Sequence, residues 1–585
     1  MTTRRELFKF AGGSAMGLLL TPAPWRLITD TALWSENWPG IPRPARGEIR
    51  AKFTHCGLCA AGCAVRARCV GEQPVSLAGV EGGLCPFGVT GHHLPYHPER
   101  LKEGNRQEAA AAMAAAVSHS TPERRVAVLD LRPGRTASWT YRRAMAAIPN
   151  GCYLAPEEPA CAVNLAAAAT VLSLGAPLLD GWGRLSRVFA ARPNFRLIQA
   201  EAVESRTAAL ADQWLAVQPG TETVLGRAVA GQIGTQQAAE VTGLAAEQIE
   251  QVARALRENG PALIVAPEMT SEVLAWNLPL GGWGKTVLPR REAPVPGNWG
   301  KAAPVTDWAT LKDGSLGALL IDESVPGAHL PWATIQPKLA ADAVVVAFAW
   351  SRAGYARHAT HVLPTAVYPE ALGDLPAAID ATAAEFRLTV PLVAAPGGMT
   401  DPVELVSAMA GLDAKDALHE RAAAIYAAGR GSLRTYADGK STAVKELKPD
   451  DFWKGLNAGG SWTGGPENCG PAPKLKEAAW PEEDTGALWP FRLATEQPGA
   501  ATLVAPLMAK LSQESRLRLA PHSAAMHPRD GFEEGARLVL ETPYGRCPIV
   551  AALDESVPPG VVLVADGPEI ADIRSADGRA RVVRI

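Results

Sequence analysis

Short apolar runs recur along the first two thirds of the chain and alternate with alanine-rich stretches. The runs are rich in Val, Leu, Ile and Ala, a composition that is typical of parallel strands buried on both faces. The stretches at 107–117 and 238–256 are rich in residues that favour helices. Strands that alternate with helices predict an α/β architecture with parallel sheets. The expected strands are 126–131, 169–174, 195–199, 262–266, 317–321 and 343–348.

The pattern changes twice toward the C-terminus. Residues 431–490 are rich in Gly, Pro and Trp, as in the segment 459–466, and we expect them to form a long surface linker. After residue 490 come short apolar runs, at 536–542 and 561–565, that are separated by Pro and Gly turns. This spacing predicts a C-terminal domain built of β-strands.

The N-terminus carries an expected targeting segment. Thr3–Lys9 reads TRRELFK and resembles a twin-arginine export signal, and residues 10–20 are uncharged. A chance arginine pair in a cytosolic amphipathic start is the alternative. The uncharged stretch is shorter than the roughly 20 apolar residues of a membrane span. Prolines surround the one candidate cleavage position. We therefore expect residues 1–23 to be an export signal or a retained anchor, with a linker at 24–50 and the protein on the periplasmic side of the inner membrane.

Composition and charge narrow the classes of function. The chain has 585 residues, of which 57 are basic and 60 acidic, so no strong positive field favours nucleic acid as a partner. Hydrophobic residues make up 47% of the sequence, which is enough for several packed cores. No segment after the N-terminus is apolar enough to span a bilayer, so any further membrane attachment is expected through partner subunits.

Four of the nine cysteines are grouped in a pattern that suits a metal cofactor. Cys56, Cys59 and Cys63 form a triplet with two and then three residues between them, and Cys85 follows after 21 intervening residues. A [4Fe–4S] cluster needs four converging thiolates, and a tight loop can supply three of them. Small residues inside the triplet allow the backbone to wrap closely around a cluster. The spacing therefore predicts one [4Fe–4S] cluster.

Other readings of these cysteines stay open. Four cysteines also suit a structural zinc site, although such sites usually use two CxxC pairs. Disulfides fit poorly with a protein that folds in a reducing cytoplasm before export. Cys69 is a fifth thiol nearby and an alternative to Cys85 as a ligand. The remaining cysteines are expected to be buried free thiols: Cys152, Cys161, Cys469 and Cys547.

Several segments resemble the molybdopterin oxidoreductase family. The cysteine triplet, together with Leu84–Pro86 and His97–Lys102, is similar to the N-terminal domain of that family. Ala359–Thr365 followed by Glu370 is similar to its characteristic strand and acidic turn, and 201–222 is similar to the segment that meets the pterin nucleotide. The matching positions in the last segment are Thr207, Ala211, Asp212, Pro219, Gly220 and Thr221.

The resemblance implies a multi-domain α/β fold that ends in a β-barrel. The implied divisions are a [4Fe–4S] domain at 51–105, two parallel-sheet α/β domains at 106–260 and 261–430, the linker at 431–490 and the barrel at 491–585.

Three features depart from the catalytic members, which hold molybdenum or tungsten on two pterin guanine dinucleotides. Those members have Lys or Arg two positions after the fourth cysteine, whereas Phe87 stands here and offers neither charge nor a hydrogen bond. The segment between 102 and 125 is short. No candidate metal ligand stands out: Cys152 is the best of them, and a structural thiol is the alternative reading of it. No CxxCH haem motif is present, so three histidines are expected to pack near the cysteine loop or face solvent: His92, His93 and His97.

Within the family, the segments 5–9, 33–43, 178–182 and 452–462 resemble the molybdopterin-binding-like subunits of menaquinone reductase and alternative complex III. These subunits keep the fold but lack pterin and molybdenum. The resemblance implies an iron–sulfur electron-transfer subunit of a membrane-associated quinone oxidoreductase complex. Its implied partners are a multihaem cytochrome c, a ferredoxin-like subunit with several clusters and a multispan quinone-binding membrane subunit.

The alternative function is a catalytic molybdenum or tungsten bis-pterin oxidoreductase that acts on a small oxyanion or sulfur compound. The turn Pro219–Glu222 favours it, because such a turn can meet a nucleotide. The same turn also fits a purely structural role, in which Gly220 adopts a special backbone angle and the next two residues cap a helix.

Overall fold

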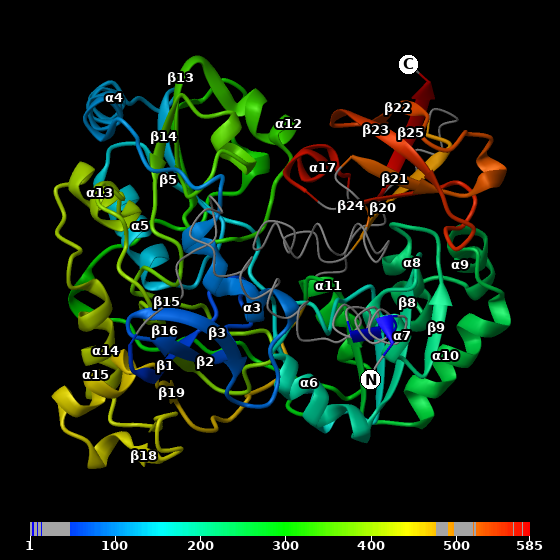
Figure 1. The fold of residues 1–585 in the computed structure, drawn as a ribbon, viewed down its shortest axis with the longest axis horizontal. Helices are drawn as coiled ribbons and strands as arrows, with labels where there is room; N and C mark the ends of the chain where they lie inside the picture. Colours follow the sequence, from blue (N-terminus) through cyan, green and yellow to red (C-terminus); the bar gives the residue numbers. More distant parts are fainter. Residues whose placement is uncertain are drawn as a thin grey trace.

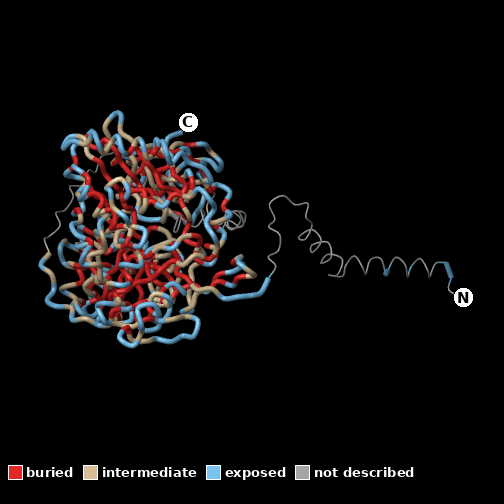
Figure 2. Tube along the Cα trace, turned by 90° about the vertical axis from the view of Figure 1, so that its left-hand side faces the viewer, coloured by how far each residue is buried: buried red, intermediate tan, exposed pale blue. Residues whose placement is uncertain are grey.

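The computed structural model describes residues 47–475, 489–496, 522–565, 567–575 and 577–584, with residues 3–4, 9, 13–14 and 519. The export signal expected at 1–23 and the linker expected at 24–50 lie almost wholly outside the described residues. Within the described part of the chain, no helix is both long and apolar enough to cross a membrane. Buried residues gather throughout the folded body beneath an exposed surface (Figure 2).

A small antiparallel sheet opens the fold. It contains β1 (Ile49–His55), β2 (Ala64–Val70) and β3 (Gln73–Gly79) in that order. His55 pairs with Ala64, so the first two strands meet where the chain enters and leaves the loop 56–63. The short helix α3 (Pro86–Thr90) follows the sheet. The pairing therefore fixes both ends of the segment that holds the cysteine triplet.

The first large sheet is parallel and combines distant parts of the chain. Its strand order is β14-β13-β12-β4-β5. Nearly every residue of β4 and β12 is buried, as expected for strands covered on both faces. Its strands are β4 (Arg125–Asp130), β5 (Gly151–Leu154), β12 (Leu316–Glu323), β13 (Leu339–Ala349) and β14 (His361–Pro364), and helices that pack beside it are α4 (Arg106–Ser118), α5 (Thr136–Ala147) and α13 (Pro402–Met409).

The second parallel sheet has the order β10-β7-β8-β9. Figure 1 shows two of its strands, β8 and β9, beside the helices that cover them. One helix was expected at 238–256, but the structure has two, which are separated around Gly243. Gly243 has a φ of 76°, and a left-handed glycine is a common way to end a helix. The elements are β7 (Thr170–Leu174), β8 (Arg196–Glu201), β9 (Gln213–Ala216) and β10 (Ala262–Val265), with α8 (Glu222–Val229), α9 (Thr235–Thr242), α10 (Ala246–Glu258) and α11 (Ser271–Asn277).

Much of the segment expected to be a linker is folded. Residues 432–463 contribute three strands to a five-stranded sheet, and their Trp462 is completely buried. Burial of this indole and of Phe452 explains why the segment packs instead of crossing the surface. The elements are β15 (Gly373–Asp374), β16 (Glu385–Thr389), β17 (Ser432–Arg434), β18 (Ser441–Ala443), β19 (Ser461–Thr463) and α15 (Pro449–Asn457).

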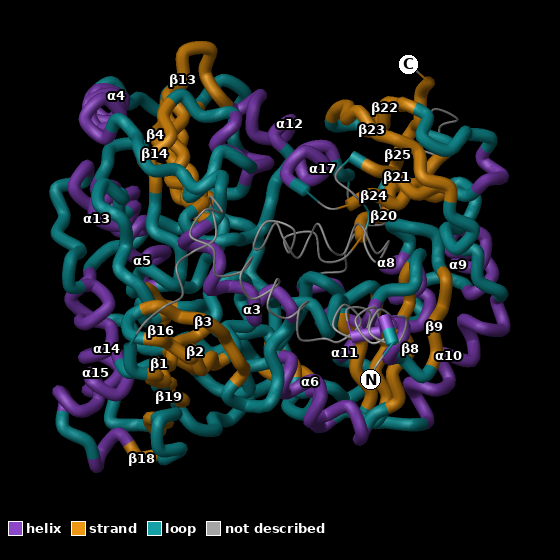
Figure 3. The backbone as a smooth tube through the Cα atoms, viewed as in Figure 1, coloured by secondary structure: helices purple, strands orange, loops and turns teal. Residues whose placement is uncertain are grey.

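The C-terminal part is a closed barrel with the strand order β20-β24-β21-β23-β22-β25. Figure 3 shows its strands grouped beside the parallel sheets. The strands expected at 536–542 and 561–565 are both present. The barrel elements are β20 (Phe491–Glu496), β21 (Ser523–Met526), β22 (Arg537–Thr542), β23 (Gly545–Leu553), β24 (Val561–Ala565), α17 (Pro568–Ile573) and β25 (Arg579–Arg584).

The predicted boundaries at residues 106–260 and 261–430 do not separate the two parallel sheets. β4 pairs with β12 of the second predicted domain, and β10 of the second pairs back with β7 of the first. The chain therefore leaves one sheet after β5, builds all four strands of the other and returns to the first with β12. A boundary drawn along the sequence cannot describe such a crossing, because the pairing partners are far apart in the chain.

Candidate functional site

The carboxyl ends of the first parallel sheet open onto a cavity of about 310 Å³. Ligands of open α/β folds commonly bind at this edge of the sheet. The residues that follow β4, β12, β13 and β14 line it, among them Leu131, Ser324, Trp350 and Tyr368. The lining is mainly apolar. We call this space the cysteine cavity because of the residues on its remaining wall.

All four predicted cysteines line the cysteine cavity. Cys56 and Cys63 are buried at the two ends of the triplet loop, where the Cys56 N–H donates to the Cys63 carbonyl at 2.9 Å. Cys59 lies at the middle of the loop, and Cys85 immediately precedes α3. Cys69 is buried in β2 and is not among the lining residues. The structure therefore brings Cys85, and not Cys69, to the triplet.

Two buried arginines hold the outside of the triplet loop. Arg132 donates to the carbonyls of Gly57 and Leu58 at 2.6 and 3.1 Å. Arg387 of β16 donates to the carbonyls of Ala61 and Gly62, both at 2.7 Å. When a peptide carbonyl points outward to an arginine, the N–H of the same peptide points the opposite way and is free to face the cavity. Each arginine also brings a positive charge close to the thiols.

The position of Arg132 follows from a buried ion network at the end of β4. Arg135 bridges Asp130 and Asp322 at 2.9 and 2.8 Å, which joins β4 to β12. The Arg132 N–H donates to the same Asp130 at 3.0 Å. Because an unpaired charge at this depth is costly, the turn between these arginines is firmly held. Nothing in the local sequence marks Arg132 or Arg387 as a residue that binds the triplet loop.

Tyr368 lies against the triplet loop from the other side. Gly57 and Gly91 both leave room for it, since a Cβ on either glycine would lie less than 3 Å from the tyrosine side chain. The hydroxyl is fully buried next to Cys56 and has no hydrogen-bond partner among the described residues. An O–H in this position can donate to a thiolate or to a bound sulfide.

Burial makes ionisation of the thiols unfavourable without a cation. Burial and the neighbouring cysteines raise the pKa of Cys56, and burial followed by the charge of Cys59 raises the pKa of Cys63 to about 12. Burial also raises the pKa of Cys85. A metal ion supplies the positive charge that such thiolates need. The donor set therefore suits iron or zinc.

A second cavity, of about 1050 Å³, lies at the carboxyl ends of the other parallel sheet. We call it the acidic cavity. The residues that line it after β7, β8 and β10 include more carboxylates than cations. Burial, and to a smaller extent the charge of Glu201, raises the pKa of Glu222 to about 7, although backbone hydrogen bonds to this carboxylate lower it. The charged lining residues are Glu201, Glu204, Glu222, Glu268, Glu272, Arg206 and Arg574.

Phe87 lines both cavities and stands between them. At this position, between the two cavities, the family's catalytic members carry Lys or Arg, whereas this chain has an apolar ring. A diphosphate group brought into the acidic cavity would face five carboxylates and two guanidinium groups. The lining therefore carries more acidic than basic groups on the side that a diphosphate would meet.

The positions that resemble a nucleotide segment have structural roles here. Gly220 has a φ of 77°, and a Cβ there would lie 2.4 Å from the backbone oxygen of Asp577 in the barrel region. Thr221 donates to the Gln218 carbonyl and does not cap α8, contrary to the expected capping role. Asp212 accepts from the Leu197 N–H at 2.7 Å. Thr207 is buried, Ala211 is partly buried against the core, and Pro219 lines the acidic cavity.

The other candidate ligands do not line either cavity. Cys152 is buried within β5 and lines neither cavity, so the structure gives it no place as a molybdenum ligand. His92 and His93 lie together on a short 3₁₀ helix, with His93 exposed. His97 is buried edge-on against Trp350, as one of the two expected outcomes.

The structure also brings together two of the segments that resemble the family, His97–Lys102 and the acidic turn at Glu370. The sequence did not indicate this contact. Arg100 and Glu370 form a buried ion pair, with side chains 3% and 2% exposed. Arg100 also donates to the Thr365 carbonyl. This pair fixes the end of the predicted [4Fe–4S] domain against the turn that carries Tyr368.

The fold places the chain in a structural class. The structure is similar to acetylene hydratase from Pelobacter acetylenicus, with a TM-score of 0.63 over 91% of this chain and 100% of that chain. The sequence identity is 13%, so the likeness shows the fold alone. The molybdopterin-oxidoreductase-like fold predicted from the motifs, with its parallel sheets and closing barrel, is confirmed.

A curated relative is similar in sequence. Over 416 residues, or 56% of this chain, it is 26% identical to the menaquinone reductase, molybdopterin-binding-like subunit, of Nitratidesulfovibrio vulgaris. The matched region spans 60% of that relative's length. No known protein family profile matches the chain. The two similarities agree with the resemblance that the motifs carried.

Proposed function

We propose that this chain is an iron–sulfur electron-transfer subunit of a membrane-associated quinone oxidoreductase complex and that it works without molybdopterin. The observation that carries the proposal is the convergence of Cys56, Cys59, Cys63 and Cys85 on one cavity. Similarity to a menaquinone reductase subunit supplies the class of complex. A [4Fe–4S] cluster bound there supplies one-electron transfer, with a potential set by nearby hydrogen bonds and charges.

The spacing of the thiols supports a cluster over a single zinc ion. A tetrahedral zinc site with Zn–S bonds of about 2.3 Å brings its sulfurs to about 3.8 Å from one another. Among the described residues, no three of these cysteines form a set whose ligand atoms all lie within 4.8 Å. A four-iron cube is larger and holds its thiolates farther apart. The wider arrangement therefore favours iron and sulfide.

This chain's own residues would hold and tune the cluster. Arg132 and Arg387 fix the loop and place positive charge beside it, which favours the reduced, more negative cluster. The buried Tyr368 hydroxyl can donate toward Cys56. The apolar lining of the cavity limits the access of water. Phe87 and the acidic lining beyond it support the absence of a pterin.

Metal analysis of the purified chain tests the proposal. We expect about four irons per chain, no stoichiometric molybdenum or tungsten, and an EPR signal after reduction. Cys59→Ser should lose the cluster, whereas the matched variant Cys69→Ser should keep it, because Cys69 does not line the cavity. Stoichiometric molybdenum or tungsten would instead establish the bis-pterin oxidoreductase, and a chain with zinc in place of iron would refute electron transfer.

We propose further that the protein is exported by the twin-arginine pathway to the periplasmic side of the inner membrane. The expected signal around Arg4 and Arg5 supports this. Replacing both arginines by lysine should leave the folded protein in the cytoplasm, and the Lys9→Arg variant serves as the control. Export of the double variant at the normal level would contradict the assignment.

The proposed partners are a multihaem cytochrome c, a ferredoxin-like multi-cluster subunit and a multispan quinone-binding membrane subunit. The similarity to a subunit of a menaquinone reductase supports partner subunits of this kind. Affinity purification from membranes in mild detergent should recover all three with this chain. Recovery of the chain alone, at native expression levels, would count against a role inside such a complex.

A further inference from the structure

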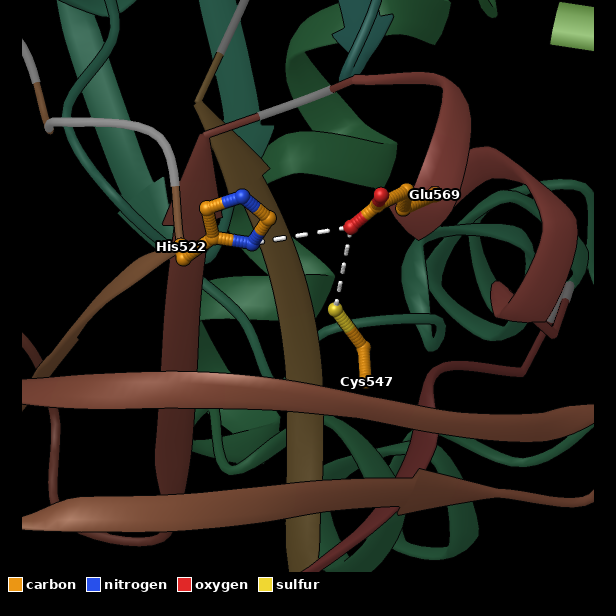
Figure 4. A group of neighbouring side chains, drawn as sticks. All are labelled: His522, Cys547 and Glu569. Atoms are coloured by element: carbon orange, nitrogen blue, oxygen red, sulfur yellow. Dashed lines mark hydrogen bonds and ion pairs between the residues drawn. The ribbon is translucent and has the colours of Figure 1, made fainter.

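Three potential metal ligands meet on the barrel, outside both cavities. His522 lies just before β21, Cys547 lies in β23, and Glu569 lies in the first turn of α17. Figure 4 shows the imidazole and the thiol on either side of the carboxylate. His522 Nδ1 is 3.5 Å and Cys547 Sγ 3.9 Å from Glu569 Oε2, and the three ligand atoms all lie within 4.8 Å of one another.

This spacing is close to what one cation requires. Metal–ligand bonds of about 2.0–2.3 Å in a tetrahedral site place the ligand atoms about 3.3–3.8 Å apart. Small side-chain rotations would bring all three atoms to that spacing. Within the described parts of the chain, this is the one set of three or more His, Cys, Asp or Glu side chains that is so compact.

Each ligand is held by its surroundings. The His522 backbone has a φ of 63°, an uncommon angle for a residue other than glycine, and its carbonyl accepts from the Val550 N–H at 2.8 Å. Arg357 Nη1 lies 3.7 Å from Glu569 Oε1, so the other carboxylate oxygen faces the histidine and the cysteine. Cys547 is 2% exposed and therefore fixed by packing. An outer-shell cation that orients a ligand carboxylate is a common feature of metal sites.

The ligand chemistry indicates the class of metal. Thiolate, imidazole and carboxylate together suit zinc, whereas calcium and magnesium prefer oxygen ligands alone. His522 and Glu569 side chains are 52% and 51% exposed, which leaves access for the ion and for a water as fourth ligand. A nucleophilic thiol is the other use of such a triad, but a cysteine buried this deeply is closed to a substrate.

We propose that His522, Cys547 and Glu569 form a zinc site that fastens α17 to the barrel strands β21 and β23. The site has a consequence beyond the barrel, because two residues at α17 line the cysteine cavity. Gly567 lies just before this helix, and Ala571 lies within it. Zinc bound here stabilises one wall of that cavity. The proposal stands independently of the cofactor assigned to the four cysteines.

The test uses the full chain, purified anaerobically and treated with a mild chelator, then titrated with Zn²⁺ and with Co²⁺ as a spectroscopic probe. The wild-type chain should bind one more metal than His522→Ala and Cys547→Ser, and only the wild type should show the thiolate-to-cobalt absorption of this site. Zn²⁺ should raise the melting temperature of the wild type, and Ca²⁺ and Mg²⁺ should not.

The matched control is His119→Ala, which removes an exposed histidine at the end of α4 and should behave as the wild type. His522→Ala keeps the experiment decisive if Cys547→Ser fails to fold, because His522 is half exposed. An affinity for zinc at least tenfold weaker in His522→Ala, with unchanged circular dichroism, supports the site. Equal stoichiometry and equal thermal shifts in the wild type and His522→Ala would overturn it.

Discussion

At the scale of single residues, the cysteine cavity is defined by the few polar groups that face it. Tyr368 is the clearest case, because its hydroxyl is buried beside Cys56 and has no hydrogen-bond partner among the described residues. Two glycines make room for the ring. A buried hydroxyl without any partner costs free energy, so its position favours a role toward the thiolate or a bound sulfide.

Tyr368→Phe should therefore make the reduction potential of the cluster more negative. A lost hydrogen bond to the cluster is worth about 1 kcal/mol, which for a one-electron couple is about 40 mV. An EPR-monitored redox titration measures the shift. Tyr426→Phe is the control, since it loses a hydrogen bond to the Leu447 carbonyl far along the chain from the cysteines. An unchanged potential in Tyr368→Phe would show that the hydroxyl does not reach the cluster.

The Arg100–Glu370 pair should behave as a buried salt bridge. Glu370→Gln leaves the guanidinium without its charge partner, so it should lower the free energy of unfolding by about 3–5 kcal/mol. The double variant Arg100→Met/Glu370→Leu should cost clearly less than Glu370→Gln, because no unpaired charge remains. Urea denaturation of the variants gives the comparison. A cost for Glu370→Gln below about 1 kcal/mol would mean that the pair is not isolated from solvent.

At the scale of elements, the triplet loop depends on two arginines from different parts of the fold. Arg132 follows β4 and Arg387 lies in β16, and together they bind four loop carbonyls. The antiparallel pairing of β1 with β2 fixes the ends of the loop but not its middle. The arginines therefore shape the part of the loop that carries Cys59.

Arg387→Met should lower the iron content of the purified chain to less than half of the wild-type value, because two loop carbonyls lose their donor. The control is Arg421→Met, which removes another buried arginine that binds Asp374 and does not contact the loop. Iron analysis and circular dichroism of both variants separate loss of the cluster from loss of the fold. Full iron occupancy in Arg387→Met would show that the loop holds its shape without the clamp.

Local patterns predicted the elements well and their pairing less well. The apolar runs at 126–131 and 317–321 became β4 and β12, since buried parallel strands have a distinctive composition. Their pairing joins segments far apart in the chain, and no local signal encodes it. The Gly- and Trp-rich segment was misleading because Trp462 is buried in a sheet instead of lying in a linker.

The candidate site divides in the same way. The four cysteines were predictable from their spacing, because a loop can present three thiolates only at short intervals. Arg132, Arg387 and Tyr368 were not, since each reaches the cavity by tertiary packing. The acidic cavity was also missed, because its carboxylates come from the ends of separate strands.

At the scale of the whole molecule, one carboxylate of α17 joins the barrel region to the segments that follow strands of the first parallel sheet. Figure 1 shows α17 on the side of the barrel that faces this sheet. Asp572 of α17 accepts from His329 at 2.9 Å, from His358 at 3.0 Å and from Arg357 at 2.5 Å. His358 stacks on Trp332, with ring centroids 4.3 Å apart. The same helix carries Glu569 and borders the cysteine cavity, so this cluster sets the position of a wall of the cavity.

Asp572→Asn should destabilise the contact in a pH-dependent way. Burial raises the pKa of Asp572, but hydrogen bonds from His329 and His358 and the charge of Arg357 outweigh it, so the folded-state pKa lies below its ordinary value. Stability from a carboxylate of this kind is fully present above its unfolded pKa, about 3.9, and is lost as the pH falls through the lower folded value. At pH 7 the variant should be less stable by about 1.5–3 kcal/mol, the worth of hydrogen bonds to a charged group.

Thermal denaturation of Asp572→Asn and the wild type across pH 3–7 measures this dependence. The gap between their melting temperatures should narrow below about pH 4, as the wild-type carboxyl becomes protonated. Asp416→Asn, at an exposed position before α14 (Ala417–Ala427), should match the wild type throughout. A gap that stayed constant down to pH 3 would mean that Asp572 acts through its shape and not its charge.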